Sequence, residues 1–165
     1  MVRMLSRFAL LLALAGVAPA PQAAQPGDAD ALQGVEEVRL LWDIQLADTL
    51  KLDNWLTVMR DTHEALQRQG REPRMVLIFR GAAVELLSRS LDHVPIEEMG
   101  MIQDVHRHLR ALDAMEHVKL RACNLALRRY GMADATLVPG VKPVTNSFLA
   151  IAGYTRQGYT RIPVP

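Results

Sequence analysis

Cys123, the only cysteine of the chain, lies where one hydrophobic pattern gives way to another. Apolar and polar residues alternate over Val118–Cys123, which is typical of a short strand. Over Asn124–Gly131 a helix-starting residue, two leucines and a set of helix-stopping residues follow in that order. We therefore expect Cys123 at the end of a strand and the start of a helix, where backbone N–H groups and the helix dipole favour a thiolate.

Polar side chains at other predicted strand ends could support chemistry at this cysteine. Ligands of an open parallel sheet bind beyond the carboxyl ends of its strands. The sequence at the predicted ends reads Trp42-Asp43, Arg80-Gly81, Cys123-Asn124 and Thr145-Asn146. This set joins a soft nucleophile, a guanidinium and hydrogen-bonding groups, and it would suit a small anion or a sulfur species. Each residue alone also has an ordinary explanation: a surface ion pair for Arg80, a helix cap for Asn146 and core packing for Trp42.

Four arginines differ in how well they could lower the pKa of the Cys123 thiol. Arg80 and Arg121 are the better candidates, since Arg121 lies two residues back on the same face of the predicted strand. Arg128 and Arg129 lie roughly 7–9 Å further along the helix axis and suit the helix C-terminus better. The residues alone leave two alternatives, a reactive thiol and a buried inert one.

Other catalytic and metal-binding motifs are absent from the sequence. His106 and His108 are two residues apart on a predicted helix, so they point in different directions and lack the spacing of a zinc pair. The chain contains no HExxH, CxxC, GxSxG, P-loop or GxGxxG motif. We therefore expect neither a metal nor a cofactor, and a serine hydrolase, an NTPase or a Rossmann oxidoreductase has no motif support.

Residues 1–24 have the organisation of a secretory signal peptide. Arg3 and Arg7 precede an apolar run, and the small residues Ala18-Pro19-Ala20 suit cleavage at a position between 20 and 24. We therefore expect a periplasmic protein in which residues 25–34 form a flexible leader to the domain.

Charge and hydropathy exclude further classes of partner. Without Arg3 and Arg7, 17 basic and 18 acidic side chains remain, so nothing favours binding to nucleic acid. No apolar run after the predicted signal peptide is long enough to span a membrane.

Residues 35–165 predict one α/β domain. The unbroken apolar run Met75–Phe79 indicates a strand covered on both faces, as in a parallel sheet. Further strands are expected at residues 35–43, 118–123, 141–144 and 159–164, and Pro143 favours an edge strand or a strand end. Helices are expected from a cap at Asp53 to Gly70, at 82–89, from Pro95 onward, after Cys123, and from 146 or 147 to 157. This alternation predicts a single three-layer domain with about five mainly parallel strands flanked by helices.

From about residue 35 to residue 165 the chain resembles the DsrE/DsrF-like family, small α/β proteins related to sulfur-relay subunits. The stretches that carry the resemblance are Val76–Gly81, Val118–Cys123, Leu137–Val141 and Gly153–Tyr159. The chain looks most like secreted members, which have a signal peptide and a C-terminal Gly-Tyr-x-x-x-Gly-Tyr motif. The resemblance implies a five-stranded parallel sheet, assembly into homo-oligomers, and a cysteine, here Cys123, that carries sulfur as a persulfide.

One feature departs from the pattern of the family. Many relatives have an Asn-Thr or Asn-Ser pair two residues after the cysteine, whereas Asn124-Leu125-Ala126 follows directly here. This departure removes a hydroxyl that could orient the sulfur. The residues that we expect to bind the ligand or support the thiolate are Arg80, Gly81, Arg121, Asn124 and Asn146.

Three functions stay open at this point. The first is a carrier of sulfane sulfur on Cys123, whose partner would be a donor or acceptor protein or a small sulfur compound. The second is a non-catalytic ligand-binding or assembly module with an inert Cys123. The third is a thiol peroxidase, which would need the resolving thiol of another protein because this chain has none.

Overall fold

The computed structural model describes residues 27–92, 94–132 and 137–165. The predicted signal peptide therefore lies outside the described residues. Residues 29–34, which belong to the predicted leader, form turns, and the Leu32 N–H donates to the Asp28 carbonyl at 2.9 Å. Within the described ranges, no helix combines the length and the apolar character needed to cross a membrane.

Five parallel strands form one sheet in the order β4-β3-β2-β1-β5. The strands are β1 Glu37–Ile44, β2 Glu72–Phe79, β3 Val118–Cys123, β4 Val141–Val144 and β5 Thr160–Val164. Pro143 lies on the edge strand β4, where its missing N–H does not interrupt the interior of the sheet. These observations confirm the predicted single α/β domain with a five-stranded parallel sheet.

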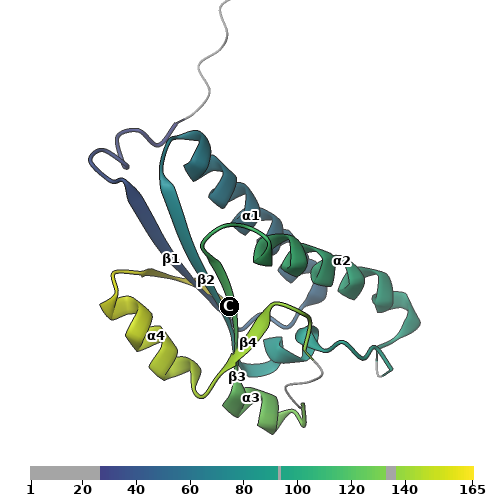
Figure 1. Cartoon of the computed structure of the whole chain (residues 1–165). Coiled ribbons are helices and arrows are strands. Elements are labelled where there is room, and N and C mark those ends of the chain that lie inside the picture. The colour runs from purple at the N-terminus through teal and green to yellow at the C-terminus, as the bar shows by residue number, and fades with distance from the viewer. Residues whose placement is uncertain (1–26, 93, 133–136) are drawn as a thin grey trace, which may run out of the picture.

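Helices cover both faces of this sheet (Figure 1). They are α1 Thr49–Arg68, the 3-10 helix η1 Gly81–Leu87, α2 Ile96–Asp113, α3 Asn124–Arg129 and α4 Ser147–Arg156. The helices α1 and α2 lie on one face, and α4 lies on the other. From β1 to β4 each new strand is added on the same side of the sheet, but β5 is added on the other side, next to β1. Because crossovers between parallel strands are right-handed, the connection from β4 to β5 has to pass over the opposite face, and α4 lies in that connection.

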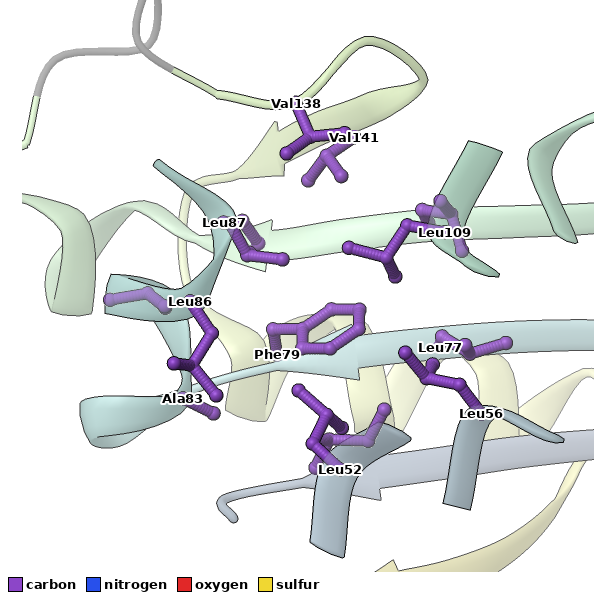
Figure 2. Close-up of a cluster of buried hydrophobic side chains, with 14 of the residues drawn as sticks. Leu52, Leu56, Leu77, Phe79, Ala83, Leu86, Leu87, Leu109, Val138 and Val141 are labelled. Atoms are coloured by element: carbon purple, nitrogen blue, oxygen red, sulfur yellow. The ribbon is translucent and has the colours of Figure 1, made fainter. Parts of the chain in front are cut away.

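The larger hydrophobic core lies between the sheet and the pair α1 and α2. Phe79 at the end of β2 is fully buried there, among leucines of α1, η1 and α2 (Figure 2). A smaller cluster lies under α4 and contains Val76 and Ile78 of the same strand. Strand β2 is thus covered on both faces, as its apolar sequence predicted.

Two expected helices differ from those in the structure, one in where it begins and one in its type. Helix α1 begins at Thr49, because the carboxylate of Asp48 accepts a hydrogen bond from the Lys51 N–H at 2.9 Å and so caps the helix. Asp53, which we expected to be the cap, lies in the second turn, where its carboxylate is 3.5 Å from His108 Nε2. The helix expected at 82–89 is instead the 3-10 helix η1.

Gly140, in the turn before β4, has a backbone conformation that other residues rarely adopt. Its φ is +92°, and a Cβ at this position would lie 2.3 Å from the carboxylate of Asp113. We expect Gly140→Ala to lower the free energy of unfolding by about 1–2 kcal/mol. Urea unfolding measures this change. Gly153→Ala in the middle of α4 is the control: a Cβ there meets nothing within 4 Å, so that variant should be no less stable than wild type.

The buried side chain of His106 holds η1 against α2. Its Nε2–H donates to the Leu86 carbonyl at 3.0 Å, and burial holds the pKa of the imidazole below the usual 6.5, with help from the Arg110 charge and against this hydrogen bond. The imidazole of His106 therefore binds a proton more readily in the unfolded chain than in the folded one. The free energy of unfolding accordingly falls as the pH falls below about 6.5. We expect the unfolding free energy to fall less between pH ~7 and pH ~5 in His106→Gln than in wild type. Equal losses in urea unfolding would contradict this assignment.

Candidate functional site

Cys123 occupies the junction that the sequence predicted for it. It is the last residue of β3 and the N-cap residue of α3, and the residue is only 4% exposed. The Ser147 N–H, in the first turn of α4, donates to Sγ at 3.4 Å. The thiol thus lies between the beginnings of two helices, α3 from its own strand and α4 from the neighbouring strand β4.

The surroundings of Cys123 favour its thiolate. Burial by itself raises the pKa of the thiol. Hydrogen bonds from the hydroxyl and the N–H of Ser147, and from the N–H groups of Ala126 and Leu125, outweigh burial and hold the pKa below its usual value. The thiolate is therefore stabilised mainly by hydrogen bonds.

A pocket of about 630 Å³ opens onto Cys123. Three of its lining residues carry guanidinium groups: Arg80, Arg128 and Arg129. The other lining residues are small or apolar: Gly81, Leu125, Ala126, Ser147 and Phe148. A thiol at the wall of a pocket that three positively charged side chains line suits a reaction with an anionic ligand.

Arg80 connects this pocket with the end of strand β1. Its Nε and Nη2 donate to the two carboxylate oxygens of Asp43 at 2.6 and 3.0 Å. Its Cζ also lies 5.4 Å from the centre of the Phe148 ring, which is a cation–π contact. The expected guanidinium is therefore at the pocket, held by an ion pair inside the fold.

The structure brings only some of the expected site residues to the pocket. Arg80 and Gly81 line it together with Cys123. Arg121 does not line the pocket. It lies on β3 in register with Ile78 of β2, and its Nη1 donates to the Leu120 carbonyl at 2.9 Å.

The two expected asparagines lie at helix starts outside the pocket lining. Asn124 is the first residue of α3, and Cys123 itself holds the cap position. Asn146 is the N-cap of α4, where its Oδ1 accepts from the Phe148 N–H at 2.9 Å. Asn146 therefore fixes the helix start that presents Ser147 and Phe148 to the pocket.

Three residues at the site were not expected from the sequence. Arg128 and Arg129 lie in the last turn of α3, as predicted, and they also line the pocket, which was not predicted. Because α3 has only six residues, its last turn still borders the pocket that opens onto Cys123. The hydroxyl of Ser147, at the start of α4, helps to hold the pKa of the Cys123 thiol below its usual value. The polar run Thr145-Asn146-Ser147 at a strand end was the signal that could have indicated it.

Metal-binding side chains do not gather in the described part of the chain. Among residues 27–92, 94–132 and 137–165, no group of three or more His, Cys, Asp or Glu side chains could hold a metal ion.

Comparison with solved structures assigns the fold. The chain superposes on the protein of unknown function MTH1491 from Methanobacterium thermoautotrophicum with a TM-score of 0.57 and 20% sequence identity, covering 76% of this chain and 98% of that one. The ychN protein from E. coli gives a TM-score of 0.52 and 18% identity, with 79% and 97% covered. The chain has the DsrE-like fold. This result confirms the fold that the sequence resemblance implied.

Sequence comparison adds one relative. An uncharacterized protein from Aquifex aeolicus (strain VF5) is 22% identical over 126 residues, which are 76% of this chain. The chain spans 56% of the length of that relative. No family model matches the chain.

Proposed function

We propose that this protein handles sulfane sulfur through a persulfide on Cys123. The observation that carries the proposal is the position of the thiol, whose pKa is lowered, in a pocket with the guanidinium groups of Arg80, Arg128 and Arg129. The DsrE-like fold supports it, because the resemblance to sulfur-relay proteins covers the same stretch of chain. The partner would be a donor or acceptor protein or a small sulfur compound.

Thiosulfate illustrates the chemistry that this site would perform. The Cys123 thiolate attacks the outer sulfur of thiosulfate and forms a new S–S bond. The bond between the two sulfurs of thiosulfate breaks, and its electron pair leaves with sulfite. No net oxidant is needed, because one S–S bond replaces another. Both reactants and the persulfide product are anions, so the guanidinium groups at the pocket would lower their mutual repulsion.

Intact mass spectrometry tests the proposal directly. We expect the wild-type protein to gain the mass of one or more sulfur atoms after incubation with thiosulfate or polysulfide, and Cys123→Ala to gain none. Treatment with dithiothreitol should remove the added sulfur. If wild type gains no sulfur that the variant lacks, the proposed function is wrong.

One observation favours a second candidate function. Cys123 is almost fully buried, which is also typical of an inert thiol in a non-catalytic ligand-binding or assembly module. Alkylation of the native protein over a range of pH distinguishes the two. Rapid alkylation with an apparent pKa below that of an ordinary cysteine would exclude the inert thiol.

We also propose a periplasmic location and assembly into homo-oligomers. The location rests on the predicted signal peptide, and fractionation of expressing cells followed by N-terminal sequencing tests it.

Assembly is supported by exposed apolar side chains on α4, where Phe148 and Leu149 are 64% and 68% exposed. Light scattering coupled to size-exclusion chromatography should give a mass above that of one chain.

A further inference from the structure

Asp43 is a carboxylate with no exposed surface at the end of β1, and two arginines surround it. Arg80 donates to both oxygens, as described above, and Arg161 of β5 donates to Oδ2 through Nε at 2.8 Å and through Nη2. Burial would raise the pKa of this carboxyl, but the hydrogen bonds and charges of the two arginines outweigh burial and hold the pKa below its usual value. Asp43 is therefore ionised inside the fold at neutral pH.

The geometry of the pair fixes the plane of the Arg80 guanidinium. A carboxylate that accepts two parallel N–H bonds allows one orientation of the group, whereas a single contact would leave it free to rotate. Phe148 lies against the same guanidinium at 5.4 Å. Only two of the five N–H groups of Arg80 are needed for the paired bonds to Asp43, so the remaining three can serve a ligand in the pocket.

Arg80 is also electrostatically connected to the thiol. The hydrogen bond and the charge of Asp43 raise the pKa of Arg80 above its usual value despite burial, and the Cys123 thiolate adds to the same effect. Asp43 itself does not line the pocket, so any influence that it has on the reaction must act through Arg80.

We propose that Asp43 is a positioning residue, which holds the Arg80 guanidinium at the pocket wall so that it contacts the anionic ligand of Cys123. This inference rests on the proposed function, in which that ligand is an anionic sulfur compound. It has a sharp consequence, because positioning and simple charge neutralisation predict opposite results. If Asp43 only neutralised Arg80, then removing its charge would make the pocket more attractive to anions. If Asp43 positions Arg80, then removing it should make the pocket less attractive.

Alkylation of Cys123 with two matched reagents tests this inference on the full-length protein. Iodoacetate is an anion and iodoacetamide is neutral. The rate constant for iodoacetate divided by that for iodoacetamide therefore reports the positive electrostatic potential at the thiol. We expect Asp43→Asn to lower this ratio by about three- to tenfold and to move the pH midpoint of alkylation upward. A ratio that is unchanged or higher overturns the inference. Asp48→Asn is the matched control, because it removes the same charge after the same strand and asparagine still caps α1.

A second variant decides the question if Asp43→Asn does not fold, which circular dichroism will show. Arg80→Lys keeps the charge next to Asp43, but an ammonium group cannot form the planar pair of bonds. We expect the same fall in the ratio, and an unchanged ratio would overturn the inference. Failure of the proposed function is distinguishable, because it appears as absent sulfur uptake in wild type, whereas failure of positioning appears only in the alkylation ratio of the variants.

Discussion

Phe79→Ala is expected to lower the free energy of unfolding by about 3–5 kcal/mol, the largest loss of stability that we predict for a single substitution. Phe79 has no exposed surface, and it is enclosed by side chains from α1, η1 and α2 (Figure 2). Truncation removes the apolar area of the ring and leaves a cavity that three separate elements would have to close. Urea unfolding followed by circular dichroism measures the change.

Phe148→Ala is the matched control for this substitution. Phe148 is 64% exposed on α4, so in a single chain, measured at low protein concentration, the same truncation should change the unfolding free energy by no more than about 1 kcal/mol, including its contact with Arg80. Equal losses in the two variants would show that the core does not rest on the end of β2. The comparison matters for the site, because Arg80 follows Phe79 directly and depends on the same strand end.

The sequence predicted those parts of the fold that depend on local patterns. The run Met75–Phe79 is apolar throughout because both faces of β2 are covered, so composition alone indicated an interior strand. The change of period at Cys123 likewise indicated the junction between β3 and α3, since alternation and helical spacing are properties of neighbouring residues. Pro143 indicated an edge because a missing N–H is tolerated there.

The parts of the site that depend on tertiary contacts could not be predicted in this way. Asp43 is 37 residues from Arg80 and 118 from Arg161, and it meets them because β2 and β5 both pair with β1. No local pattern reveals that β5 crosses the sheet to this position. The place of Arg128 and Arg129 in the last turn of α3 was predicted correctly, but no local pattern shows that this helix borders the pocket, so their part in the pocket lining was not predicted.

Ser147→Ala is expected to raise the pKa of the Cys123 thiol and to slow its alkylation by iodoacetamide near neutral pH by about tenfold. The variant removes the hydroxyl that stabilises the thiolate, while the backbone N–H of residue 147 stays in place at 3.4 Å from Sγ. A hydrogen bond to a charged group contributes about 1.5–3 kcal/mol, so the loss of this one should shift the pKa of the thiol clearly. The pH dependence of the alkylation rate measures the pKa.

A loss of reactivity in Ser147→Ala has to be separated from a disturbed start of α4. Asn146→Ala provides that separation, because it removes the cap bond to the Phe148 N–H but leaves the hydroxyl of Ser147 in the chain. We expect it to lower stability by about 1 kcal/mol and to shift the thiol pKa less than Ser147→Ala does. If the two variants shift the pKa equally, then the position of the helix, rather than the hydroxyl, controls the thiolate. If neither shifts it, the thiolate depends on the backbone N–H groups of residue 147 and of α3 rather than on the hydroxyl of Ser147.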